Sequence, residues 1–97
     1  MTELHWLQDW YLSQCDGEWE HEGGVMIDTI DNPGWKVEIS LKESQTEHIR
    51  GRSLTENASE SDWIICKVVD GKFLGVGGPA KLIRILAVFR SWLEDNG

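Results

Sequence analysis

The chain has 97 residues, of which 40% are hydrophobic and 27% charged, and it carries a formal net charge of −8. This composition is typical of one soluble globular domain, here residues 1–97, and excludes a disordered acidic tail. The acidity argues against binding to nucleic acid or to an anionic membrane surface, because both associations depend on Lys and Arg. Two cysteines, no signal peptide and no long apolar run favour a reduced, cytoplasmic setting.

An amphipathic helix is predicted from Glu3 to about Ser13. Thr2 is suited to cap its N-terminus, and Glu3 lies in the first turn, where a negative charge is favourable. The apolar residues at helical spacing are Leu4, Leu7, Trp10 and Tyr11.

An acidic segment follows the predicted helix. The first 35 residues contain no Lys or Arg and hold the whole net charge in eight carboxylates: Glu3, Asp9, Asp16, Glu18, Glu20, Glu22, Asp28 and Asp31. Residues 16–22 are the densest part and also contain Trp19. A concentrated negative field with an aromatic anchor predicts a surface that meets a positively charged partner.

Two strands joined by a tight turn are predicted next. Val25 to Ile30 forms the first strand, and residues 32–35 form a type II turn in which Gly34 supplies a positive φ. The second strand alternates strictly, which predicts a half-buried antiparallel strand. Its inward residues are Trp35, Val37, Ile39 and Leu41.

The middle of the chain is polar, and the best prediction there is a weak edge strand at about residues 47–54. Residues 63–69 are apolar on both faces, as expected for a central strand. Asp70-Gly71 then predicts a hairpin into a strand at residues 72–76.

A second helix is predicted after Gly77-Gly78, with Pro79 in its first turn. Its apolar stripe consists of Leu82, Ile85, Leu86, Phe89 and Leu93. The fold class is therefore α+β: an N-terminal helix, an antiparallel sheet of four or five strands, and a C-terminal helix, with both helices on one sheet face.

The sequence contains weak candidates for chemistry. Cys15 and His21 could form a nucleophile and its base, but reactive cysteines lie in electropositive surroundings, and this one is followed by four carboxylates. A packed, inert thiol is favoured. No CxxC pair and no second His at ligand spacing supports a metal site.

The glycine-rich stretch at residues 75–79 has a superficial likeness to a phosphate-binding loop. It lacks the GxGxxG or GxxxxGK[ST] spacing that such loops require. The exit of a hairpin into the N-terminus of a helix is the favoured interpretation.

Several stretches together resemble the immunity protein 53 family: Trp10-Tyr11, Gln14 to His21, Asp31 to Trp35, Asp62-Trp63 with Cys66, and Phe73 to Gly78. The resemblance spans nearly the whole chain. It implies a small cytoplasmic protein, encoded beside a polymorphic toxin, that protects its producer by binding the toxin domain.

The functional hypothesis combines this resemblance with the charge. The chain is expected to bind a toxin domain, such as a basic nuclease, and to cover its active surface without catalysis. Trp19 or His21 would be the central contact of an interface formed by Asp16, Glu18, Trp19, Glu20, His21, Glu22 and Asp31.

Two other hypotheses stay open: a small enzyme that uses Cys15 or His21, and a regulatory interaction module without a toxin partner. The sequence predicts no cofactor and no metal, and it does not indicate an oligomeric state.

Overall fold

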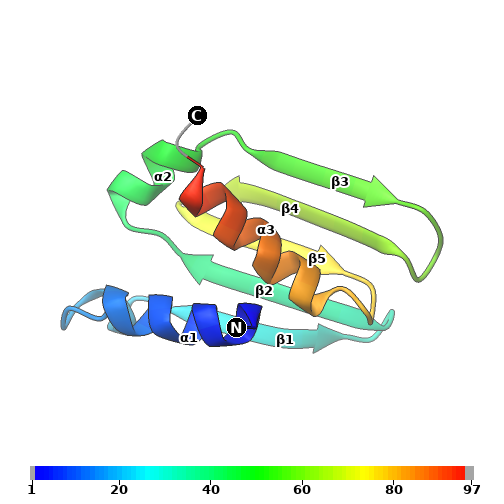
Figure 1. The fold of residues 1–97 in the computed structure, drawn as a ribbon, viewed down its shortest axis with the longest axis horizontal. Helices are drawn as coiled ribbons and strands as arrows, with labels where there is room; N and C mark the ends of the chain where they lie inside the picture. Colours follow the sequence, from blue (N-terminus) through cyan, green and yellow to red (C-terminus); the bar gives the residue numbers. More distant parts are fainter. Residues whose placement is uncertain (1, 96–97) are drawn as a thin grey trace.

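The structure, a computed structural model, describes residues 2–95. Its elements follow one another along the chain as drawn in Figure 1. They are α1 (Glu3–Gln14), the 3-10 helix η1 (Trp19–His21), β1 (Val25–Ile30), β2 (Gly34–Ser40), α2 (Glu43–Ile49), β3 (Ser53–Asn57), β4 (Trp63–Val69), β5 (Lys72–Gly77) and α3 (Leu82–Glu94). The predicted α+β class and both terminal helices are confirmed.

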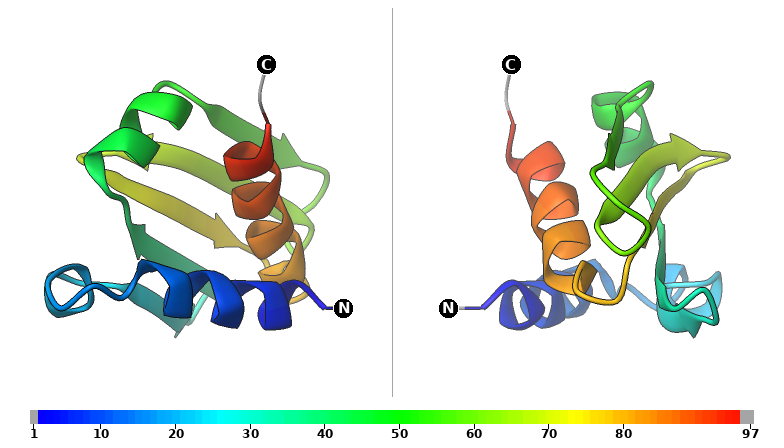
Figure 2. Two further views of the ribbon diagram at one scale, coloured as in Figure 1. Left: turned by 60° about the vertical axis from the view of Figure 1, so that its left-hand side comes forward. Right: turned by 90° about the vertical axis from the view of Figure 1, so that its right-hand side faces the viewer.

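The five strands form one antiparallel sheet in the order β1-β2-β5-β4-β3. Helix α3 packs on β2, β4 and β5, and α1 packs beside α3. Figure 2 shows both helices on the same side of the sheet. The opposite side, which we call the open sheet face, is covered by none of the three α-helices within residues 2–95.

The core lies between the sheet and the helices and is unusually aromatic. Phe89 of α3 is fully buried, and its ring centroid lies 5.0 Å from that of Trp10 and 4.9 Å from that of Phe73. Val37 and Ile39 of β2 are also fully buried, while Trp35 and Leu41 are half-buried and pack against the same core. The strict alternation of β2 therefore predicted the inward face of this strand correctly.

The polar middle of the chain differs from the prediction, because residues 43–49 form helix α2 and the edge strand β3 begins only at Ser53. The side chain of Gln45 accepts a hydrogen bond from the Lys42 N–H at 2.9 Å, which holds the helix start. Ile49 is the only fully buried side chain of α2. A helix of seven residues with one buried side chain has no detectable apolar period.

The prediction of a type II turn at residues 32–35 is wrong, and so is the placement of Pro79 in the first turn of the C-terminal helix. Gly34 does not have a positive φ, the Asn32–Pro33 peptide is cis, and Gly34 already belongs to β2. A Cβ at Gly34 would collide with the Gly77 carbonyl of β5, which explains the glycine by close strand packing. Helix α3 begins at Leu82, so Pro79 precedes it; the Pro79 carbonyl accepts a hydrogen bond from the Trp35 indole at 2.9 Å.

The β4–β5 hairpin agrees with its sequence signal. Asp70 and Gly71 have φ values of 53° and 75°, the conformation that an Asp-Gly pair adopts in a tight hairpin. Strand β4 is interior, as predicted, but only one of its faces is buried: Ile64 is 0% exposed and Ile65 is 41% exposed. Its second apolar face lies on the open sheet face.

None of the helices within residues 2–95 is long and apolar enough to cross a membrane.

Candidate functional site

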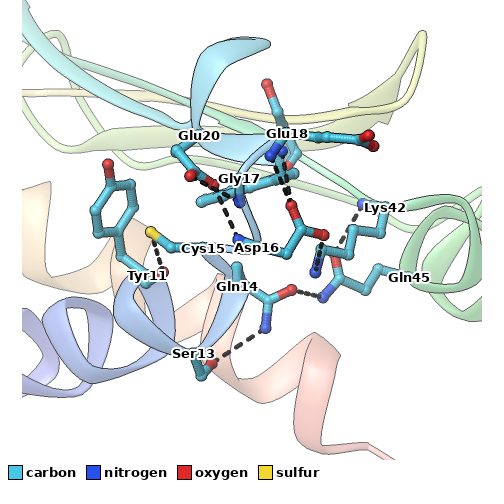
Figure 3. A network of polar contacts seen from close by, with 12 residues as sticks. Tyr11, Ser13, Gln14, Cys15, Asp16, Gly17, Glu18, Glu20, Lys42 and Gln45 are labelled. Carbon is cyan, nitrogen blue, oxygen red and sulfur yellow. Dashed lines mark hydrogen bonds and ion pairs between the residues drawn. The ribbon is translucent and has the colours of Figure 1, made fainter.

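Residues 16–22, which we call the acidic loop, fold on themselves between α1 and β1 (Figure 3). Asp16 accepts hydrogen bonds from the N–H groups of Glu18 and Trp19, at 2.9 and 3.0 Å. Glu20 accepts hydrogen bonds from the N–H groups of Asp16 and Gly17, at 3.0 and 2.8 Å. Two of the four carboxylates of the loop therefore bind its own backbone.

These hydrogen bonds change the acidity of both side chains. The N–H groups of Trp19 and Glu18, together with Lys42, lower the pKa of Asp16 to about 2. Backbone hydrogen bonds, from Glu20 itself and from Asp16 and Gly17, also lower the pKa of Glu20. Donors that point at a carboxylate stabilise its charged form.

The loop is also tied to the start of α2, because Lys42 Nζ lies 3.4 Å from Asp16 Oδ2. Next to this contact, the side-chain amide of Gln45 donates to that of Gln14 at 2.7 Å and joins α2 to the end of α1. Both contacts are drawn in Figure 3. The acidic loop is thus held by its own backbone and by the residue that precedes α2.

Trp19 is buried, which argues against it as the central contact; His21, the other candidate, is exposed. The Trp19 side chain is 5% exposed, and its ring centroid lies 5.6 Å from that of Trp10 and 5.5 Å from that of Tyr11. Its indole N–H donates to the Ser40 carbonyl at 3.1 Å. The indole therefore fixes the acidic loop to the core, because its polar and apolar parts both have partners inside the molecule.

Glu18, His21 and Glu22 are exposed, as are Asp16 and Gly17, whereas Glu20 is half-buried. Neither the Glu18 nor the Glu22 carboxylate forms an ion pair with a Lys or Arg of residues 2–95. These two charges face solvent on a loop whose backbone is already hydrogen-bonded.

Asp31 lies away from the other predicted interface residues. Asp31 follows β1, whereas the acidic loop precedes β1. The six residues of β1 span about 20 Å at ~3.3 Å per residue. The structure therefore brings together residues 16, 18, 19, 20, 21 and 22 of the predicted set and places Asp31 at the far end of the strand.

Tyr11 is a surface residue next to the acidic loop that sequence reasoning assigned to the apolar stripe of the first helix. Its side chain is 38% exposed, and that of Leu4 in the same stripe is 52% exposed, while Leu7 is buried. The neighbouring Cys15, partial burial and Glu20 raise the pKa of Tyr11. The helical period of α1 found its apolar residues but did not show that some of them face away from the core.

The cysteines are free and differ in burial. The Cys15 thiol is half-buried and donates a hydrogen bond to the Tyr11 carbonyl at 3.3 Å. Cys66 is fully buried in β4, and burial raises its pKa to about 12. Within residues 2–95 no group of three or more His, Cys, Asp and Glu side chains could hold a metal ion.

Close packing accounts for glycines in the stretch at residues 75–79. A Cβ at Gly75 would collide with the Ile85 side chain of α3, and a Cβ at Gly78 would collide with the Ser61 carbonyl. These contacts support the interpretation of the stretch as the exit of a hairpin that leads into a helix.

A comparison with protein families supplies the identity. The model of the family described as immunity protein 53 matches residues 4–94, which run from the start of α1 to the end of α3. No curated protein and no solved structure gave a match. The matched region includes the acidic loop and every strand. The chain therefore belongs to the immunity protein 53 family.

Proposed function

We propose that this chain binds and neutralises a cognate polymorphic toxin domain by covering its active surface. Family membership supports a toxin as the partner. The observation that carries the binding site is the exposed pair Glu18 and Glu22, which has no cationic neighbour within residues 2–95 on a loop held by its own hydrogen bonds. A pre-ordered charged surface loses little entropy on binding.

The charge of the chain favours a basic toxin, and a nuclease fits this description because it must hold phosphates. An acidic inhibitor can occupy such a surface in place of the nucleic-acid backbone. Complementary charge also accelerates association, to on the order of 10⁸ M⁻¹s⁻¹ at low salt. The proposed mechanism is occlusion in the cytoplasm of the producing cell, without a catalytic step.

The residues of the acidic loop have different roles in this proposal. Glu18, His21 and Glu22 face the toxin. Asp16 and Glu20 shape the loop through backbone hydrogen bonds, and their charges add to the negative electrostatic field of the loop. Asp31, at the other end of β1, contributes at longer range or at a second contact.

The test uses the purified toxin domain encoded beside the gene. The double variant Glu18→Gln/Glu22→Gln removes the two exposed charges without an ion pair and keeps the carboxylates that hold the loop. We expect slower association at low salt and a weaker salt dependence, because rim charges act mainly on the association rate. Stopped-flow or surface-based kinetics at two salt concentrations would measure both effects.

The matched control is Glu47→Gln/Glu60→Gln, which removes the same charge from exposed positions elsewhere in the molecule. We expect it to associate faster than the loop variant. Equal rates for the two double variants would show that the acidic loop does not steer the toxin.

A further inference from the structure

A groove between α1 and β1 lies beside the acidic loop. It is a hollow of about 430 Å³ lined by Leu4, Leu7, Gln8, Tyr11 and Val25. Leu7 forms a buried floor, whereas Leu4 and Tyr11 are 52% and 38% exposed on the walls. The lining is apolar except for Gln8, and β1 is an outermost strand of the sheet, so the groove opens at the edge of the molecule.

The elements around this α1–β1 groove carry only negative charge. Helix α1, the acidic loop and β1 all come from the first 35 residues, which contain no Lys or Arg. The groove and the acidic loop are continuous through Tyr11, whose ring contacts that of Trp19 and whose pKa is influenced by Glu20. An apolar hollow therefore adjoins an acidic surface.

We propose that the α1–β1 groove receives an apolar side chain from a basic segment of the toxin. This inference rests on the proposed function and names the anchor that the acidic loop lacks, since Trp19 is buried. Interfaces draw most of their affinity from a few aromatic or apolar anchors in pockets, while surrounding charges set rate and specificity.

Tyr11 is suited to form a wall of this groove because its position is fixed before binding. Its ring centroid lies 5.5 Å from that of Trp19. On another side, a Cβ placed on Gly24 would lie 3.4 Å from Tyr11 Cε1, so the ring also lies close to the backbone at the start of β1. A fixed aromatic side chain adds contact area at a small entropic cost.

The open sheet face is a second exposed apolar surface, and it fits a basic partner less well. It exposes Met26, Ile65 and Val69, which are 47%, 41% and 40% exposed. Lys36, Lys67 and Lys72 lie on this face together with Asp28 and Glu38, so its charges nearly balance. A face without excess negative charge attracts a basic toxin less than the α1–β1 groove does, because the groove has no Lys or Arg in its own elements.

The test places an arginine in the groove. Gln8→Arg is the first variant, because Gln8 is exposed and Arg is a good helix former, so α1 should be retained. Leu4→Arg is the second variant, and Ile65→Arg on the open sheet face is the control with the same added charge and a comparable starting exposure. Circular dichroism confirms folding, and equilibrium binding to the purified neighbouring toxin domain gives the affinities.

We expect each groove variant to weaken binding by at least about tenfold, as for changes at an interface centre, and Ile65→Arg to stay within about threefold of wild type. If wild type binds and the folded groove variants bind equally well, the groove inference is overturned and the proposed function stands. A loss that is larger for Ile65→Arg also overturns it, in favour of the open sheet face. If wild type does not bind the toxin domain, both proposals fail.

Discussion

Asp16 and Glu18 lie two positions apart in the acidic loop and have different roles. Both are exposed, but Asp16 accepts two backbone N–H groups and approaches Lys42, while Glu18 has no Lys or Arg of residues 2–95 within 4 Å. A carboxylate that holds a loop contributes to folding, whereas an exposed carboxylate without such contacts is available to a partner. Glu20 belongs with Asp16, and Glu22 with Glu18.

The low pKa of Asp16 gives a prediction about pH. Its value of about 2 in the folded protein is below the ordinary value of 3.8. The stability that Asp16 contributes is therefore complete above pH 3.8 and is lost as the pH falls toward 2. Asp16→Asn should be less stable than wild type at neutral pH, and the difference should shrink over this acidic window.

Denaturant unfolding of both proteins at several pH values would measure this difference. Asp31→Asn serves as the control, because Asp31 is an exposed aspartate in the turn after β1. A gap between wild type and Asp16→Asn that stays constant down to pH 2 would contradict the assigned role of the Asp16 carboxylate.

The two thiols should differ in reactivity. Cys66 is fully buried and has a pKa of about 12, so it should resist alkylation until the protein unfolds. Cys15 should be dispensable: Cys15→Ser should keep protection against the toxin, since a serine hydroxyl can also donate a hydrogen bond to the Tyr11 carbonyl. Mass spectrometry after alkylation and a growth-protection assay would check these expectations. A folded Cys15→Ser variant without protection would revive the enzyme hypothesis.

Trp19 illustrates a residue that the sequence could not place. Its burial depends on a hydrogen bond to Ser40, 21 positions later, and on ring contacts with Trp10 and Tyr11 of α1. A loop tryptophan flanked by glutamates looks the same in sequence whether its ring points inward or outward. The exposure of Glu18 and Glu22 was easier to foresee, because unpaired carboxylates rarely leave water.

At the scale of elements, α3 joins the parts of the fold. It packs on α1, α2 and three strands, and its buried residues are Ile85, Leu86, Val88, Phe89 and Trp92. Phe89 lies at the centre, with aromatic contacts to Trp6, Trp10 and Phe73. Helices α1 and α2 thus both pack on this one helix.

Phe89→Ala should lower the free energy of unfolding by ~3–5 kcal/mol, because it leaves a cavity among aromatic rings. Ile83→Ala on the same helix is the matched control: Ile83 is 51% exposed, so its truncation should change stability by about 0.5 kcal/mol or less. Urea unfolding would measure both. Similar losses for the two variants would contradict the assignment of Phe89 to the centre of the core.

Elements with a strong local signal were predictable, and those that depend on distant contacts were not. The alternating pattern of β2 indicates a strand, and the Asp70-Gly71 pair indicates a tight turn, each within a few residues of sequence. Helix α2 rests on Ile49, a single buried side chain, and on the Gln45 contacts with Lys42 and Gln14. The groove at Tyr11 could not be foreseen either, because the position of β1 beside α1 decides it.

The net charge of the molecule is concentrated at one edge of the sheet. All net charge comes from the first 35 residues, which form α1, the acidic loop and β1 at one edge of the sheet (Figure 1). In the rest of the chain, acids and bases are equal in number. Such an uneven distribution produces a directional field that can orient a basic partner before contact.

The most direct measurement of the central claim is a titration of the neighbouring toxin domain with this chain while the activity of the toxin is followed. We expect activity to fall in proportion to added chain until the toxin is saturated. We also expect Glu18→Gln/Glu22→Gln to inhibit less effectively than wild type, with the largest difference at low salt, where charge steering of the wild type is strongest. A toxin that stays fully active in excess wild-type chain would contradict the account.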